Sequence, residues 1–226
     1  CEGTIRNCGN TAAVTGSKCV GGIAGVCEGT IQNCGNTATV TGSKCVGGIA
    51  GQTTNGTTGP RIENCCNSGD VTATNKKPIG VGGLVGYSSA LTLSNSCNSG
   101  TVTARKVIDK AGGLIGCSGS AENVTVSNSW WKKNCVTQKS ETVDRSFNGQ
   151  LIGINNASYT DLQTAVNALN TNRGSNAKWE SKDGAPALKF GASEPAATIS
   201  GGKDTLWMRN SGGQPYETFT VKLDGA

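Results

Sequence analysis

The stretch CEGTIRNCGNTAAVTGSKCVGGIAGV at residues 1–26 is followed at once by CEGTIQNCGNTATVTGSKCVGGIAGQ at residues 27–52. The two copies differ only at positions 6/32, 13/39 and 26/52. A repeat of this size is typical of proteins built by stacking one small unit on the next. Because every unit must present the same faces to its neighbours, the repeat leaves little room for a unique catalytic arrangement of side chains.

Three further units with looser spacing follow, over residues 53–87, 88–117 and 118–153. Each of the five units has an apolar residue two positions before an asparagine; these asparagines are Asn7, Asn33, Asn64, Asn95 and Asn128. A valine follows nine residues after the apolar residue in the first four units, and Cys135 takes that place in the fifth. Each unit ends on a glycine phrase: VGGIAG (20–25 and 46–51), VGGLVG (81–86), AGGLIG (111–116) and the degenerate NGQLIG (148–153).

The pattern predicts an all-β parallel solenoid of about five rungs over residues 1–153. Each unit reads as three short extended segments between Gly, Asn and Ser turns, with alternating apolar residues. Parallel stacking at about 4.8 Å places each residue above its copy in the unit before. The five asparagines then form a ladder of hydrogen-bonded amides, and the glycines allow close approach of backbones.

The repeat pattern stops after residue 153. SYTDLQTAVNALNTNRG (158–174) predicts one amphipathic helix, with Ser158 or Thr160 as its N-cap and Gly174 as its terminator. We expect residues 154–190, including Trp179, to be a C-terminal cap over the open end of the solenoid core. Residues 191–226 hold short strand-like pieces that either pack on this cap or begin a following domain.

Composition excludes several function classes. The 226 residues contain no histidine, so Ser-His and Cys-His nucleophile pairs and His-based metal sites are absent. The net charge of +5 is dispersed and lacks interleaved aromatics, so we expect no nucleic-acid partner. No apolar run is long enough to insert into a membrane. We expect no enzyme activity, no cofactor and no metal, and we expect the chain to be part of a longer protein with other domains.

The glycine phrases, each paired with the apolar-x-Asn phrase, resemble the GLUG motif of large secreted and surface bacterial proteins of adhesin type. The resemblance covers about residues 1–153, and the segment around Trp179 is similar to one that often closes such arrays. It implies a right-handed parallel β-helix outside the cell or on its surface, presenting or spacing other modules. It carries no catalytic residues to this chain.

Eleven cysteines fall mostly in columns one unit apart. Stacked residues lie within the Cα separation that a disulfide tolerates. The paired positions in the first two units are Cys1/Cys27, Cys8/Cys34 and Cys19/Cys45. They predict either cross-rung disulfides or a reduced ladder of small apolar side chains.

Trp130, Trp131, Lys132 and Lys133 interrupt the last unit. They are either a ligand-contacting platform or a plug at the end of the solenoid. We therefore expect a non-catalytic module with a role in adhesion or structural presentation. Its expected partner is a host or matrix protein or glycan. The alternative is a β-helix that binds or processes carbohydrate, which would show a groove of converging carboxylates and aromatic rings.

Overall fold

The computed structural model describes residues 1–55, 59–75, 78–105, 110–119, 121–138, 141–143, 157–189, 205–206 and 219–220. The chain divides into two compact units, Cys1–Phe190 and Gly191–Ala226. In the second unit, β28 (Thr205–Leu206) pairs with β29 (Phe219–Thr220) in antiparallel fashion. The predicted choice between packing on the cap and starting a new domain stays open for this segment.

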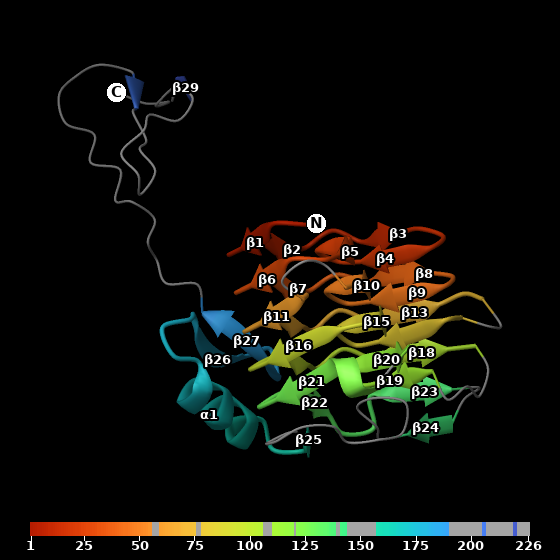
Figure 1. Ribbon diagram of the computed structural model, residues 1–226. Helices are drawn as coiled ribbons and strands as arrows, with labels where there is room; N and C mark the ends of the chain where they lie inside the picture. The colour runs from red at the N-terminus through yellow and green to blue at the C-terminus, as the bar shows by residue number, and fades with distance from the viewer. Residues whose placement is uncertain are drawn as a thin grey trace. The chain divides into compact units, whose positions relative to one another are not determined.

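The first unit of the molecule is a parallel β-solenoid, in which each of the first four repeats contributes five short strands rather than the three expected (Figure 1). The first two repeats form β1 (Thr4–Arg6), β2 (Gly9–Asn10), β3 (Val14–Thr15), β4 (Cys19–Gly21), β5 (Ala24–Cys27), β6 (Thr30–Gln32), β7 (Gly35–Asn36), β8 (Val40–Gly42), β9 (Cys45–Gly47) and β10 (Ala50–Thr53). The next two form β11 (Arg61–Glu63), β12 (Cys66–Asn67), β13 (Val71–Ala73), β14 (Gly80–Gly82), β15 (Val85–Ser88), β16 (Leu91–Ser94), β17 (Cys97–Asn98), β18 (Val102–Ala104), β19 (Ala111–Gly112) and β20 (Ile115–Ser118). The strands are short because a turn follows every two to four residues.

The fifth repeat begins with a 3-10 turn, η1 (Ala121–Asn123), and continues through β21 (Val124–Ser127), β22 (Trp130–Lys132), β23 (Val136–Gln138) and β24 (Glu141–Val143). It corrects one prediction, because Val136 and not Cys135 lies opposite Val102. The turn before β23 is one residue longer than in the fourth repeat, and it contains Asn134 with φ of 60°. The last predicted glycine phrase, residues 148–153, lies outside the described residues.

Equivalent strands of successive repeats pair in parallel to form five sheets. Three of them run through all five repeats, and the first of these is β1-β6-β11-β16-β21. The others are β2-β7-β12-β17-β22-β25, β3-β8-β13-β18-β23-β24, β4-β9-β14-β19 and β5-β10-β15-β20. Within the solenoid, β24 is antiparallel to β23. Five strands spaced about 4.8 Å apart make a stack only about 20 Å tall.

The core is a narrow column of aliphatic side chains, each above its copy in the preceding repeat. Ile31, Ile62 and Leu93 are in register in one sheet, and all three are fully buried. Val40, Val71 and Val102 form a second buried column. At the first repeat, Ile5, Val14 and Ile23 are only partly buried.

Residues 157–189 form β25 (Ala157–Tyr159), α1 (Leu162–Asn172) and a hairpin of β26 (Lys178–Lys182) and β27 (Ala185–Lys189). The helix begins after Asp161, whose carboxylate accepts a hydrogen bond from the backbone N–H of Thr164 at 2.8 Å. Asp161 is therefore the N-cap, and the expected caps Ser158 and Thr160 lie outside the helix. Gly174 follows the helix with φ of 57°, as expected of a terminator.

The helix and hairpin lie along the side of the solenoid, next to the sheet of β1, β6, β11, β16 and β21 (Figure 1). We expected them to cover its end. Within residues 157–189, β25 is the element that continues the stack, as the strand after β22. In the described part of the chain, α1 is the one α-helix, and it is too short to span a membrane.

Candidate functional site

A column of asparagine side chains marks the corner after the first strand of each repeat. Asn64 donates to Asn33 at 2.8 Å and Asn95 donates to Asn64 at 2.6 Å. Asn128 donates to Asn95 in the same way. Within the described part of the chain, the amide column ends at Asn33, and Asn7 above it is exposed.

All five corner asparagines have a left-handed backbone, with φ between 40° and 54°. Asparagine adopts this conformation more readily than other non-glycine residues, because its short polar side chain bonds locally. One residue type thus meets two demands, the sharp corner and the amide ladder. We call this column the corner ladder.

A second asparagine column lies three residues later, on β2, β7, β12 and β17. Asn10 donates to Asn36, Asn36 to Asn67 and Asn67 to Asn98, at 2.7, 2.7 and 2.8 Å. Each of these amides also donates to the carbonyl two residues ahead, as Asn67 does to Gly69 at 2.7 Å. We call this column the inner ladder. Sequence reasoning missed it, although the Asn-x-x-Asn spacing recurs in four repeats.

The inner ladder explains the second glycine of the glycine phrases in the second and third repeats. A Cβ on Gly48 would lie 2.2 Å from Cγ of Asn67, and one on Gly83 would lie 2.2 Å from Cγ of Asn98. No side chain fits at such distances, so glycine is required where the backbone passes the amide column. In the fifth repeat Trp131 takes the place of this asparagine and packs against Gly113.

The helix and hairpin form hydrogen bonds to the corner ladder and its neighbours from outside the solenoid. The indole N–H of Trp179 donates to Oδ1 of Asn64 at 2.7 Å, and Trp179 is 3% exposed. Asn176 donates to Glu63 at 2.8 Å and accepts from Gln32 at 2.9 Å. The same hydrogen-bonding groups therefore hold the repeats in register and fix residues 157–189 on their side.

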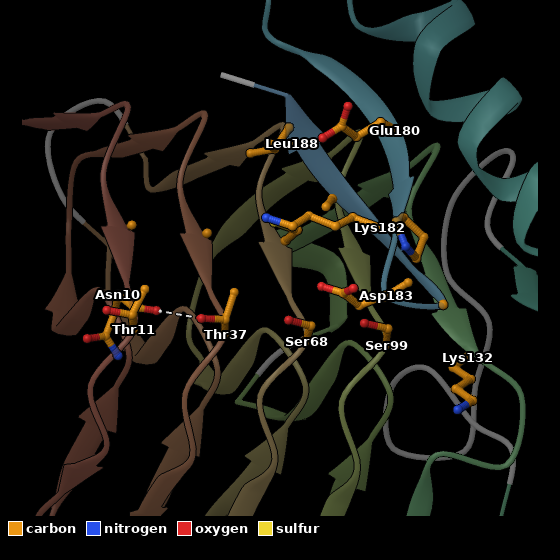
Figure 2. Close-up of a pocket in the computed structure, with 17 residues that line it drawn as sticks. Asn10, Thr11, Thr37, Ser68, Ser99, Lys132, Glu180, Lys182, Asp183 and Leu188 are labelled. Atoms are coloured by element: carbon orange, nitrogen blue, oxygen red, sulfur yellow. Dashed lines mark hydrogen bonds between the residues drawn. The ribbon is translucent and has the colours of Figure 1, made fainter. Parts of the chain in front are cut away.

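A groove of about 670 Å³ lies between the β26–β27 hairpin and the strands β2, β7, β12 and β17 (Figure 2). Its solenoid wall is a row of hydroxyl side chains, one from each of the first four repeats, directly after the inner ladder: Thr11, Thr37, Ser68 and Ser99. Its hairpin wall presents Glu180, Lys182 and Asp183, together with the apolar Pro186 and Leu188. Lys132 stands at the end of the hydroxyl row (Figure 2).

The hairpin that forms the second wall turns on Asp183 and Gly184, which have φ of 50° and 75°. Two residues with positive φ make the turn that suits the twist of a hairpin, and Asp-Gly is among its preferred sequences. Sequence reasoning did not find this groove. The Asn-Thr and Asn-Ser dipeptides in four repeats and the Asp-Gly turn were the available signals.

Of the four predicted ligand-contact residues, only Lys132 lines the groove. Trp131 is 2% exposed and belongs to the solenoid core. Trp130 is partly buried against the cluster that contains Tyr159 and Trp179, and Lys133 is exposed. Trp131 therefore packs inside the solenoid and Trp130 packs against residues 157–189, and neither tryptophan lines the groove.

Comparison with known proteins agrees with this geometry. Residues 42–72, which run from the second repeat into the third, match the model of the GLUG motif. The chain carries the GLUG motif. A search of curated proteins found no match.

The GLUG solenoid is also similar to a crystal structure of a candidate immunoglobulin A1 protease from Bacteroides ovatus. The two share 25% sequence identity with a TM-score of 0.62. The alignment covers 82% of this chain and 57% of the other, so the chain spans little more than half of that relative's length.

The cysteines of the GLUG units are all reduced in this structure. Cys19 and Cys45 are in register on β4 and β9, and burial raises the pKa of Cys45 to about 12. Cys66 and Cys97 are in register on β12 and β17, and burial raises the pKa of Cys66 to about 11. Among the described residues, no group of three or more Cys, Asp or Glu side chains is arranged to hold a metal ion.

The predicted pair Cys1 and Cys27 behaves differently. Each thiol donates to the carbonyl two residues ahead, Cys1 to Gly3 at 3.4 Å and Cys27 to Gly29 at 3.5 Å. The two sulfur atoms therefore make the same local bond in successive repeats. In the third pair, each thiol donates to the carbonyl two residues before it, Cys8 to Arg6 and Cys34 to Gln32, both at 3.2 Å.

Proposed function

We propose that this GLUG solenoid is a non-catalytic module of a secreted or cell-surface bacterial protein, with a role in adhesion or structural presentation. The observation that carries the proposal is that the repeated polar side chains form hydrogen bonds within the fold itself. Both asparagine ladders bond to their own copies in neighbouring repeats, and the corner ladder also holds residues 157–189. A site for chemistry needs polar groups that are not already committed to the fold.

The absence of histidine supports the non-catalytic proposal, since the commonest general base and nucleophile partner is missing from the sequence. The groove has two carboxylates, but Glu180 faces Lys189 at 3.7 Å. Its described lining includes no tryptophan, tyrosine or phenylalanine. A groove that processes polysaccharide would need converging carboxylates.

The dimensions of the solenoid favour a module that presents a binding surface over one that acts as a spacer. A stack about 20 Å tall adds little length to a stalk, whereas its sides offer sheet faces and the turns between strands. We propose that the display surfaces include the insertions at 53–61, 75–80, 104–110 and 132–148, parts of which lie outside the described residues. We also propose right-handed winding of the coils, the sense favoured for parallel strands joined by crossovers.

The relative from Bacteroides ovatus supports a location outside the cell and a host partner, because immunoglobulin A1 is a host protein. The test is to couple the full chain to beads and incubate them with immobilised immunoglobulin A1, mucin and matrix proteins. We expect saturable adhesion to at least one surface with no cleavage of any of them. Reproducible turnover of a protein or polysaccharide would refute the non-catalytic role, and absence of adhesion to all surfaces would refute the adhesive one.

A second candidate, carbohydrate binding, is favoured by the groove. Hydroxyls repeated about every 4.8 Å match the length of one sugar in an extended chain and offer both donors and acceptors. The test is calorimetric titration with linear hexasaccharides of glucose and N-acetylglucosamine. Thr37→Val with Ser68→Ala should abolish binding, whereas Thr41→Val with Thr72→Val, on another face with the same spacing, should not. Equal loss in both pairs, or no binding by the unaltered chain, would refute this candidate.

A further inference from the structure

Basic residues that are dispersed along the sequence come together at one corner of the solenoid. This corner joins the sheet that contains β3, β8, β13 and β18 to the sheet of β4, β9, β14 and β19. Lys18, Lys44, Arg105 and Lys110 lie in its turns, and all four are exposed. We call these four residues the basic corner. The strands beside it lie on the side of the solenoid away from α1 and the β26–β27 hairpin (Figure 1).

The stack fixes the backbone of each lysine in the basic corner. The carbonyls of Lys18, Lys44 and Lys110 accept hydrogen bonds from backbone N–H groups of a neighbouring repeat, at 2.9, 2.8 and 2.9 Å. Lys18 and Lys44 are directly stacked, because the cysteines that follow them are in register. In the third repeat Ile79 occupies this column, and Lys110 lies one strand further on, offset by one residue. The guanidinium of Arg105 donates to a backbone carbonyl of the third repeat at 3.1 Å.

The exposure of the basic corner does not depend on the ends of the stack. Lys44 lies between β8 and β9, and each of these strands is paired on both sides. Arg105 follows β18, which is also paired on both sides. These side chains are exposed because the turn itself faces solvent, whereas the apolar residues of the same strands point into the core.

No described acidic residue of this corner balances the four positive charges. The described residues of the corner are 16–18, 42–44, 74–75, 78–79, 105 and 110. The ion pair found between described residues lies elsewhere, at the hairpin, where Lys189 faces Glu180 at 3.7 Å. Residues 76–77 and 106–109 lie outside the described residues and are not part of the site; their sequence holds three lysines and one aspartate. Like charges opposite each other on adjacent strands repel, and a bound anion offsets that repulsion.

We propose that the basic corner binds a linear anionic polysaccharide that runs along the axis of the stack. The four cations follow one another from the first repeat to the fourth, a span of about 14 Å at 4.8 Å per strand. A single phosphate or sulfate group is held by donors that converge on it, whereas cations in a row fit an extended polyanion. Single-stranded nucleic acid stacks its bases on aromatic rings, and the described residues of the corner include none.

This inference rests on the adhesive function proposed above and names the class of its partner. The surface differs from the groove, which lies beside the hairpin and is tested with uncharged sugars. Charge and not shape selects the ligand here, so binding should be sensitive to salt. Exposed charges are screened over about 10 Å at 0.1 M salt and more strongly above it.

The test is calorimetric titration of the full reduced chain at pH 7.5 with octasaccharides of heparin and of hyaluronan. Heparin carries sulfate groups, whereas the anionic groups of hyaluronan are carboxylates alone, so the two probes distinguish the two sources of charge. We expect at least one octasaccharide to bind at 50 mM sodium chloride. Its affinity should fall about tenfold or more at 200 mM, because binding releases counterions.

Two triple variants separate the basic corner from the net charge of the chain. The site variant replaces three of its cations: Lys44→Gln, Arg105→Gln and Lys110→Gln. The matched control removes the same charge from three exposed residues on other elements: Arg61→Gln, Lys133→Gln and Lys178→Gln. The site variant should weaken binding about tenfold or more, and the control less than about threefold. Urea midpoints show that each variant is folded, and a double variant of Lys44 and Lys110 keeps the Arg105 hydrogen bond.

Three results would overturn the proposal: no binding of either octasaccharide, equal weakening by the site and control variants, or tighter binding of octathymidylate or of phosphatidylserine vesicles than of the octasaccharides. The adhesive function has a separate outcome. Beads that adhere although neither octasaccharide binds would refute this inference and leave the adhesive function standing. Octasaccharide binding that the site variant abolishes, with no adhesion of the beads, would support the inference and refute the adhesive function.

Discussion

The corner ladder gives the sharpest prediction, which is the cost of replacing Asn64 by alanine. Asn64 is fully buried, and its amide makes four hydrogen bonds. The substitution leaves the Trp179 indole N–H and the Asn95 amide without their acceptor. Each unsatisfied buried donor costs about 1–3 kcal/mol, and alanine in a left-handed conformation costs about 1 kcal/mol more. We expect a loss of about 4 kcal/mol in the free energy of unfolding.

Asn7→Ala is the matched control. Asn7 has φ of 54°, close to the 51° of Asn64, so the backbone cost is the same. It is exposed at the end of the column, so its replacement should cost only about 1 kcal/mol. The difference of about 3 kcal/mol between the two variants isolates the hydrogen bonds of the ladder and of Trp179.

The assay is urea unfolding of the reduced chain, followed by tryptophan fluorescence and circular dichroism. If Asn64→Ala does not fold, Asn64→Gly removes the same hydrogen bonds without backbone strain and provides the comparison. Losses for Asn64→Ala and Asn7→Ala that agree within about 1 kcal/mol would refute the reasoning, because they would show that the buried amides contribute no more than exposed ones.

Three further predictions use the same unfolding assay. Gly48→Ala should destabilise the chain by about 3 kcal/mol because its Cβ would overlap Asn67, whereas Gly3→Ala, with nothing within 4 Å, should change little; equal effects would contradict the account of the glycine phrase. Between pH 7 and 9 stability should rise, because the pKa of Cys34 is lowered on folding from 9.0 to about 7 and the unfolded chain binds the extra proton; above pH 9 it should fall, because the pKa of Cys45 is raised to about 12. Cys34→Ser should remove the rise between pH 7 and 9, and its persistence would assign the rise to another group. Trp131→Ala should cost about 3–5 kcal/mol by emptying the end of the core, and a loss under about 1 kcal/mol would show that Trp131 is not the plug.

The parallel solenoid could be predicted from the sequence because identical residues recur in phase. In a stacked structure a recurring position becomes a column, so Ile31, Ile62 and Val40, Val71 fall into register with their copies. The corner asparagines were visible for the same reason, and their positive φ adds a second cause for their recurrence. Repetition thus reveals the fold even where each single strand is too short to recognise.

Other features depend on a single residue or on a contact between distant residues. In the fifth repeat Trp131 takes the place of the inner-ladder asparagine. The one-residue insertion at the Asn134 turn moves Val136 into the place expected for Cys135. The position of the helix and hairpin is fixed by bonds such as Trp179 to Asn64, which are 115 residues apart. No local pattern in the sequence indicates such a pairing, so the predicted end cap lies along the side instead.

The groove was missed for a related reason. Its two walls come from the repeats and from the hairpin, which are far apart in the sequence. The hydroxyl row recurs in phase and could have been read from the sequence. Its role as a wall depends on where the hairpin docks, and that docking is determined by Asn33, Glu63 and Asn64 on the solenoid.

The central claim is that the repeats stack in parallel with every residue above its copy. The most direct measurement is nuclear magnetic resonance of the full chain with labelled Ile, Leu and Val methyl groups. The structure predicts strong methyl cross-peaks from Ile31 to Ile62 and from Ile62 to Leu93, and from Val40 to Val71 and Val71 to Val102. Cross-peaks confined to residues within one repeat, or shifted by one residue between repeats, would contradict it.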